Sequence, residues 1–206
     1  MKNYPQSADL KVNIAILILA AGGSRRLGTP KQLLKVTGQS LLFQTTQAAL
    51  GSRCRPVVVV LGAEANLCRA ELINLPVEVV MNERWAEGIS TSIGAGIGFL
   101  QNLDPVPEAV VIVLCDQPFL TTDLIDALVE KHQSSGCKAI ASQYGEVTGV
   151  PALFAVDYFE ALKALTGDQG ARKLLQTGQI AFLPFPRGAV DIDTVSDYEN
   201  LLGGLD

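Results

Sequence analysis

Small residues and cations stand close together near the start of the sequence, in the stretch ILILAAGGSRRLGTPKQLL between Ile16 and Leu34. The backbone N–H groups of consecutive small residues can approach a ligand closely, and such amides together form a concavity that binds anions. Arginine matches the forked geometry of phosphate oxygens, and lysine supplies a compact point charge. We therefore predict a polyphosphate site from Ala20, Ala21, Gly22 and Gly23 with the cations Arg25, Arg26 and Lys31.

The spacing within this stretch differs from known phosphate-binding motifs. Gly23 and Gly28 have the spacing of a P-loop, but Thr-Pro precedes Lys31, where that motif requires Gly-Lys followed by Ser or Thr. The pattern is not G-x-G-x-x-G either. The alternative interpretation is a tight turn from a strand into a helix with solvated cations. The number of small and cationic residues gathered here favours the polyphosphate site.

Two aspartates are candidate metal ligands. Asp116 follows the apolar run VVIVLC, and a carboxylate that faces a phosphate needs a cation between them, most simply Mg²⁺. Asp193 could supply a second oxygen. Each aspartate also has a structural alternative, because Asp116 can open a turn with Pro118, and Asp191 or Asp193 can cap a helix that begins near Ser196. Spacing leaves both interpretations open.

A glycine and three hydroxyl side chains stand at a predicted helix start in the stretch WAEGISTSIGAGIGF, residues 85–99. The free N–H groups of a helix start, together with hydroxyls, can bind a base or a phosphate. The candidate nucleotide-binding residues here are Gly88, Ser90 and Ser92. The later glycines of the stretch, Gly94 and Gly98, lie inside a helical pattern and indicate close helix packing.

Strand and helix patterns alternate along the chain and indicate how these residues are positioned. The predicted strands are Val12–Leu19, Pro56–Leu61, Val77–Met81 and Ala109–Cys115. The predicted helices are Leu41–Leu50 behind Ser40, Glu64–Leu72, Ser90–Leu100, and Asp123–Ser134 behind Thr121 or Thr122. Strands that are apolar throughout are buried on both faces, which requires a mostly parallel sheet with helices on each side. Ligands of such sheets bind beyond the carboxyl ends of the strands.

The pattern after Gly136 is less regular. It predicts the strands Ala139–Ser142, Pro151–Phe154 and Ile180–Leu183 and a final helix near Ser196–Leu202. We interpret this part as an insertion that closes over the site. We expect residues 1–11 to be an N-terminal tail and residues 12–206 to form one domain.

Composition excludes several classes of partner. The net charge of −5 gives no basic face for nucleic acid. The longest uncharged apolar stretch, Ile14–Ala21, is shorter than the roughly 20 residues of a membrane helix. The first residues lack the pattern of a signal peptide. Because the 4 cysteines are too scattered for a paired zinc motif or a disulfide framework, we expect a protein of the reducing cytoplasm.

Six stretches, in this order, resemble the MobA-like nucleotidyltransferases: LAAGGSRRLGTPKQLL, VVVVLGAEA, VVMNERWAEGISTSIGAGI, VIVLCDQPFLT, LTGDQGARKLL and DIDTVSDYENL. Within that family the sequence is most similar to the molybdenum cofactor cytidylyltransferases. The resemblance implies a Rossmann-like, three-layer α/β fold of the nucleotide-diphospho-sugar transferase type. It also implies an enzyme that uses Mg²⁺ to transfer CMP from CTP to the terminal phosphate of molybdopterin cofactor and releases pyrophosphate. A molybdoenzyme or its chaperone would be a protein partner.

The resemblance also implies roles for individual residues. The loop Ala20–Gly23 would hold the base and phosphates, Arg26 and Lys31 would neutralise the triphosphate, and Asp116 with Asp193 would hold Mg²⁺. Arg26, Lys31 and Asp116 are accordingly the expected catalytic residues.

Details of the motifs favour cytidylyl over guanylyl transfer. Guanylyl-transferring relatives usually have LAGG and GxDK, whereas this chain has LAAG and Pro30-Lys31-Gln32, and the run DQPFLT from Asp116 points the same way. Two departures, Gly149-Val150-Pro151 in place of GHP and Gly94 in place of an arginine, affect the acceptor side. The alternatives are therefore use of GTP, another phosphorylated acceptor such as a sugar or alcohol phosphate, or a non-catalytic nucleotide-binding regulator.

Overall fold

Seven strands form one sheet in a computed structural model of the protein, which describes residues 13–24, 27–176, 179–190, 192 and 194–204. The order across the sheet is β5-β4-β1-β6-β8-β7-β9, and β8 alone runs antiparallel to its neighbours. The strands are β1 Ile14–Ala20, β4 Val57–Leu61, β5 Glu78–Met81, β6 Ala109–Leu114, β7 Ala139–Tyr144, β8 Val147–Ala155 and β9 Ile180–Pro184. The predicted mostly parallel sheet is confirmed.

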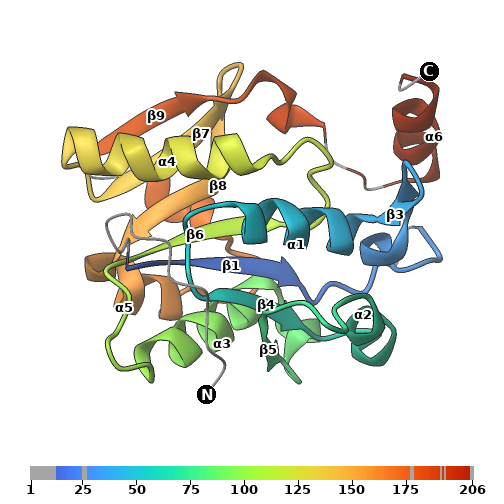
Figure 1. Cartoon of the computed structure of the whole chain (residues 1–206), viewed down its shortest axis with the longest axis horizontal. Helices are drawn as coiled ribbons and strands as arrows, with labels where there is room; N and C mark the ends of the chain where they lie inside the picture. The colour runs from blue at the N-terminus through green and yellow to red at the C-terminus, as the bar shows by residue number, and fades with distance from the viewer. Residues whose placement is uncertain (1–12, 25–26, 177–178, 191, 193, 205–206) are drawn as a thin grey trace.

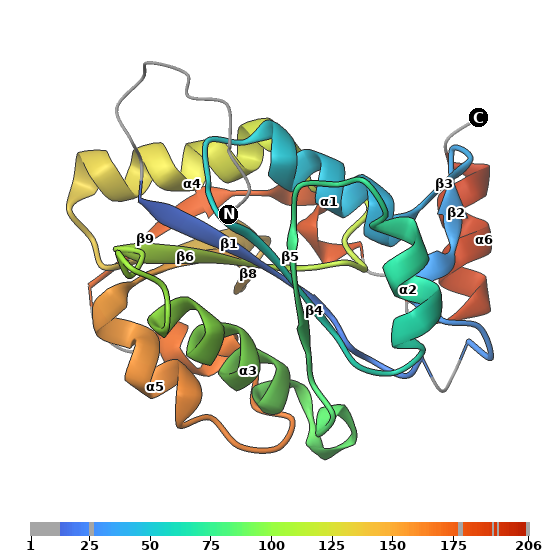
Figure 2. The ribbon, with the colours of Figure 1, turned by 60° about the horizontal axis from the view of Figure 1, so that its bottom comes forward.

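Helices cover both faces of the sheet (Figures 1 and 2). On one face lie α1 Leu41–Gly51, α2 Ala65–Glu71 and α4 Thr122–Ser135, and on the other lie α3 Ile89–Gln101 and α5 Phe159–Lys163. Short 3₁₀ turns are η1 Lys31–Leu33, η2 Trp85–Glu87, η3 Val156–Tyr158, η4 Ala171–Gln176 and η5 Pro186–Ala189. The three-layer α/β architecture follows the prediction.

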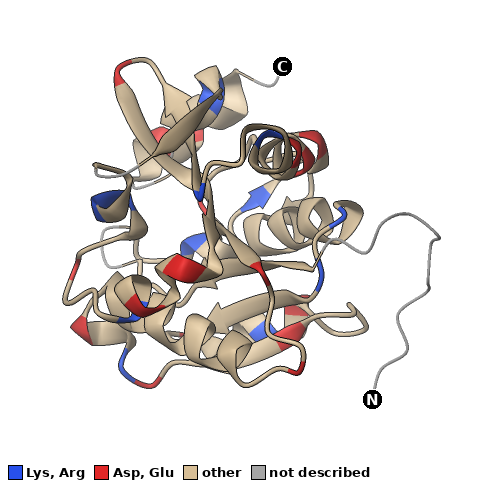
Figure 3. Ribbon diagram, turned by 90° about the vertical axis from the view of Figure 1, so that its left-hand side faces the viewer, with Lys and Arg blue, Asp and Glu red and all other residues tan. Residues whose placement is uncertain are grey.

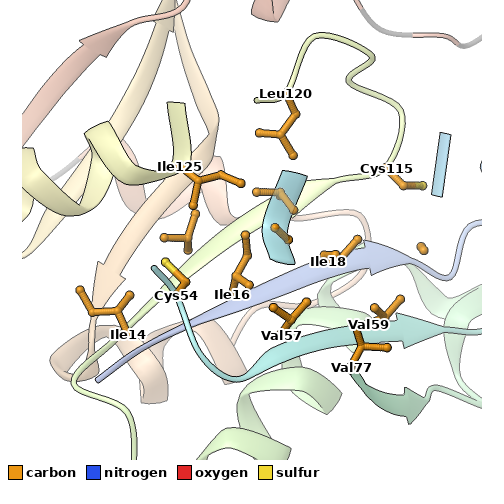
Figure 4. Close-up of a cluster of buried hydrophobic side chains, with 14 of the residues drawn as sticks. Ile14, Ile16, Ile18, Cys54, Val57, Val59, Val77, Cys115, Leu120 and Ile125 are labelled. Carbon is orange, nitrogen blue, oxygen red and sulfur yellow. The ribbon is translucent and has the colours of Figure 1, made fainter. Parts of the chain in front are cut away.

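Each central strand contributes to two apolar cores, because its side chains alternate between the faces. Ile16 and Ile18 of β1 lie in one cluster with Ile125 of α4, which Figure 4 shows, whereas Leu17 packs on the other face with Ile97 of α3. Burial of β1 on both faces explains its unbroken apolar sequence. The central strands are therefore packed on both faces, and this packing fixes the positions from which the loops after their carboxyl ends begin.

Hydroxyl side chains cap the starts of α1, α4 and the C-terminal helix. Ser40 Oγ accepts from the Phe43 N–H at the start of α1, as predicted, and at α4 the cap is Thr121 rather than Thr122. The helix α6, Val195–Gly203, is capped by Thr194 through a capping box with Asp197. Asp191 and Asp193, the cap candidates from the sequence, lie outside the described residues.

The segment after Gly136 is not an insertion, and that prediction is wrong. Its strands β7, β8 and β9 complete the main sheet, and its helix α5 packs against α3. The reason is that β8 pairs with β6 along an apolar register from Ala152 to Ala155, which buries both strands.

A small hairpin of β2 Lys35–Val36 and β3 Gln39–Ser40 follows η1 and is covered by α6. The Tyr198 hydroxyl donates to the Lys35 carbonyl at 2.7 Å. The predicted tail, residues 1–11, lies outside the described residues. In the described parts of the chain, every helix is too short or too polar to span a membrane. Acidic and basic positions are interspersed in the view of Figure 3.

Candidate active site

A pocket of about 800 Å³ lies at the carboxyl ends of β1 and β6. Most of the residues proposed from the sequence line it together, although they come from four separate parts of the chain. These are Ala20, Ala21, Gly22, Gly23, Lys31, Gly88, Ser92 and Asp116. Arg25, Arg26 and Asp193 lie outside the described residues, so their predicted roles stay predictions.

The loop after β1 is held in place by Gln32, a residue that sequence reasoning missed. The Gln32 side chain is buried, and its amide nitrogen donates to the carbonyls of Ala20 at 3.0 Å and Gly22 at 2.7 Å. The backbone N–H of Lys31 donates to Ser24 Oγ at 2.8 Å, and this bond is a second link between the loop and η1. With these carbonyls bound by Gln32, the loop keeps a defined shape without a ligand.

Lys31 and Asp116 form an ion pair between Nζ and Oδ2 at one side of the pocket. Lys31 begins η1, and Asp116 lies just beyond the end of β6. Their side chains are 21% and 12% exposed, so water screens the pair only in part. The geometry therefore places one positive and one negative group together beside the small-residue loop.

The other carboxylate oxygen of Asp116, Oδ1, is buried and has no hydrogen-bond partner among the described residues. A buried carboxylate oxygen without a partner is costly unless a ligand satisfies it, and Mg²⁺ prefers such oxygens. Within the described residues, no cluster of three or more His, Cys, Asp or Glu could hold a metal by itself. Asp116 therefore fits a cation that completes its ligands with substrate phosphates, the usual arrangement for Mg²⁺.

Cys115 lies beside Asp116 in the pocket lining. Burial is the main reason that the pKa of this thiol is raised well above its ordinary value, and the charge of Asp116 raises it further. Only a thiolate is an effective nucleophile, so Cys115 stays protonated near neutral pH. The side chain contributes apolar surface to the pocket rather than covalent chemistry.

Asn82 organises the opposite wall of the pocket, and the sequence analysis missed it as well. Its buried side chain donates to Thr91 Oγ1 and Ser92 Oγ, both at 2.9 Å, and accepts from the Arg84 N–H at 3.0 Å. These bonds tie the end of β5 through η2 to the first turn of α3. The orientation of Ser92 at the pocket is therefore fixed by Asn82.

Gly88 joins this wall to a turn from the C-terminal half of the chain. Its φ of +115° favours glycine, and an added Cβ would lie 2.2 Å from the Gly167 carbonyl oxygen. The Ser90 N–H donates to the same oxygen at 3.1 Å. Ser90 is buried and does not line the pocket, whereas Asp168, which the sequence analysis did not identify, does.

The fold and this edge of the sheet define an α/β protein whose site lies at the carboxyl ends of its strands, as in nucleotide-binding members of this class. The chain belongs to the MobA-like NTP transferase family, because its residues 16–181 match the MobA-like NTP transferase domain.

Curated relatives of the chain carry different names. It is 33% identical over 203 residues to the purine catabolism protein PucB of Bacillus subtilis, covering 89% of this chain and 93% of PucB. It is 29% identical over 167 residues to the nicotine blue oxidoreductase of Paenarthrobacter nicotinovorans, covering 78% and 80% of the two chains. It is also 29% identical over 164 residues to the probable molybdenum cofactor guanylyltransferase of Mycobacterium marinum, covering 79% of this chain and 78% of that protein.

Solved structures share the fold. The complex of Rv0371C from Mycobacterium tuberculosis H37Rv with manganese has a TM-score of 0.76 at 26% identity, covering 92% of this chain and 98% of that one. A CMP:2-keto-3-deoxy-manno-octonic acid synthetase complexed with CTP has a TM-score of 0.71 at 12% identity, covering 93% of this chain and 98% of the synthetase chain. The second likeness concerns the fold alone.

Proposed function

We propose that the protein transfers CMP from CTP to the terminal phosphate of molybdopterin cofactor in the presence of Mg²⁺ and releases pyrophosphate. The observation that carries this proposal is the Lys31–Asp116 pair beside the loop Ala20–Gly23 in one pocket. A cation, a carboxylate and a bare-backbone loop are the groups that a triphosphate and its metal require. We place the reaction in the cytoplasm.

The chemistry needs charge stabilisation rather than a strong base. The acceptor phosphate oxygen attacks the α-phosphorus in line while pyrophosphate leaves, and negative charge accumulates on the oxygens. Lys31 and the amides of the loop stabilise that charge, and Arg26 is the further cation that the sequence supplies. Asp116, with Asp193, would hold Mg²⁺, which would neutralise phosphate charge when bound. No histidine is required for such a mechanism.

The choice of CTP rests on the motif LAAG at Ala20 and on Pro30-Lys31-Gln32. GTP is the second candidate, because relatives of this chain include probable molybdenum cofactor guanylyltransferases. Comparing the thermal stabilisation by CTP, GTP and ATP with Mg²⁺ tests the choice. A ligand at 100 times its dissociation constant raises stability by roughly 2.7 kcal/mol. Preference for GTP would overturn the cytidylyl assignment.

The acceptor is tested by release of pyrophosphate. The Gln117 side chain donates to the Val150 carbonyl at 2.9 Å, so the unusual Gly149-Val150-Pro151 segment lies next to the strand end that carries Asp116. We propose that the acceptor approaches the α-phosphate from this side. Release with molybdopterin cofactor supports the proposal, and release only with a sugar or alcohol phosphate supports another acceptor. Tight nucleotide binding without release would identify a regulator.

A further inference from the structure

The order of the strands gives the pocket two chemically different sides. β1 lies between β4 and β6 in the sheet. Asp116 follows β6 and pairs with Lys31, so this ion pair lies on the β6 side of the loop that follows β1. The end of β4, on the other side of β1, is followed by Gly62 and Ala63, which carry no charge.

Trp85 lies over the end of β4. A Cβ added to Gly62 would lie 2.6 Å from Trp85 Cβ and 2.8 Å from its Cγ, so the side chain crosses directly over the end of β4. A Cβ added to Gly23 would lie 2.9 Å from Trp85 Cζ3, so the far edge of the indole reaches the loop after β1. The two glycines thus make room for one aromatic ring, which lines the pocket and is half-buried.

Hydrogen bonds fix the backbone that carries the indole, and the close contacts at Gly62 and Gly23 confine the ring itself. Trp85 begins η2, and its carbonyl accepts from the Gly88 N–H at 3.3 Å. The preceding residue, Arg84, is fixed through its backbone N–H by the buried side chain of Asn82. A ring that is already ordered loses little conformational freedom when a planar ligand stacks on it.

We propose that Trp85 is the residue against which the base of the bound nucleoside triphosphate lies. The triphosphate must face Lys31 and the cation that Asp116 would hold, because those groups carry the complementary charge. The base then extends toward β4, where the indole offers an apolar, polarisable face, and bases stack on aromatic rings. This inference rests on the proposed function in one respect, namely that the pocket binds a nucleoside triphosphate.

Two probes separate contact with the base from contact with the phosphates. CTP carries both parts, whereas inorganic tripolyphosphate carries only the charged one. Calorimetric titration of Trp85→Ala should show CTP affinity reduced roughly 10-fold or more, the scale of losing one base–aromatic stack. Tripolyphosphate affinity should stay within about twofold, because no phosphate contact is removed, and Trp85→Phe should retain most of the CTP affinity. Arg84→Ala, at an exposed position of the same turn, is the matched control and should bind CTP like the wild type.

A second measurement uses the unmodified protein, whose single tryptophan is Trp85. CTP should change its fluorescence, and tripolyphosphate should not. Unchanged CTP affinity in Trp85→Ala, or an equal loss for both probes, would overturn the inference, since an equal loss means that the pocket has only loosened. If Lys31→Ala weakens both probes while Trp85→Ala weakens neither, only the role of Trp85 fails. If the wild type binds neither probe, the proposed function fails with it.

Discussion

Lys31 pairs with Asp116 across 85 positions of sequence, and the pair lies at the carboxyl edge of the sheet beside the loop that follows β1. The pairing joins the two groups that the sequence assigned separately to the triphosphate and to the metal. In this pair each charge neutralises the other. Under the proposed function, the triphosphate would take the place of Asp116 as the negative partner of Lys31, and the cation would take the place of Lys31 as the positive partner of Asp116, so neither charge would be left buried and unpaired.

Asp116→Asn keeps the shape of the side chain and removes its charge. We expect metal-dependent pyrophosphate release to fall by about 100-fold or more, as for other losses of charge stabilisation in an active site. The circular dichroism spectrum should be unchanged. Asp157→Asn is the matched control, because Asp157 pairs with Lys138 on the exposed surface and should not affect turnover. Wild-type turnover in Asp116→Asn would remove this carboxylate from the mechanism.

Lys31→Ala should weaken triphosphate binding. Hydrogen bonds to charged groups contribute about 1.5–3 kcal/mol, so the dissociation constant for CTP should rise roughly 10- to 100-fold in calorimetric titrations. Lys138→Ala, which removes a lysine from the exposed pair with Asp157, provides the comparison and should bind normally. Normal CTP affinity and a normal rate of turnover in Lys31→Ala would show that Lys31 does not contact the triphosphate.

Gln32→Leu preserves side-chain volume and removes the hydrogen bonds of the amide to the loop. The carbonyls of Ala20 and Gly22 would lose their partner, so the free energy of unfolding should fall by about 1–3 kcal/mol in urea titrations. CTP should also bind more weakly because the loop loses its shape. Gln44→Leu removes similar bonds, to Val36 and Gln39, outside the pocket. It should reduce stability without changing CTP affinity, and equal effects on affinity would contradict a positioning role for Gln32.

Gly88→Ala should be strongly destabilising. An alanine at φ +115° is strained by about 1–3 kcal/mol, and its Cβ would collide with the Gly167 carbonyl, so the turn carrying Asp168 must move. Gly94→Ala, in the same helix region with open space around it, should instead stabilise the protein by up to about 1 kcal/mol. Urea unfolding measures the free energy of unfolding of the two variants. Equal values would contradict a structural role for the close approach of Gly88 to Gly167.

Stability should decrease at alkaline pH. Burial raises the pKa of Cys54 to about 12 and that of Cys68 to about 11, whereas an unfolded thiol titrates near roughly 8.5. Between these values the folded state binds more protons than the unfolded state, so the free energy of unfolding falls as pH rises, by at most about 1.4 kcal/mol per pH unit for each thiol. Urea titrations from about pH 8 to 10 measure the slope, which Cys54→Ala should make shallower. Identical slopes for the wild type and Cys54→Ala would show that the Cys54 thiol does not cause the loss of stability at alkaline pH.

Elements that are apolar throughout could be located from the sequence. β1, β4 and β6 were predicted within two residues at each end, and Ser40 was recognised as a cap, because local composition alone decides these features. The direction of β8 was not predicted, since a strand's composition does not encode which way it runs. Its start at Val147 was missed because Gly149 and Pro151 interrupt the apolar run.

Within the site, the small-residue loop, Lys31 and Asp116 were predictable because glycines and charges stand out in an apolar background. Gln32 and Asn82 were not, since a buried amide is identified only by the tertiary partners that satisfy it. Close packing was wrongly assigned to Gly94 and Gly98, which have open space around them. The close packing is instead at Gly96, where an added Cβ would lie 2.3 Å from the Leu17 side chain.

The arrangement of β4 and β6 on opposite sides of β1 has an evolutionary consequence. If Trp85 receives the base as proposed, substitutions near the end of β4 would alter a surface separate from the Lys31–Asp116 pair, so a descendant could acquire a new substrate preference while that pair stays intact. Such modularity allows a single ancestral scaffold to diversify by small steps, each of which leaves a working enzyme.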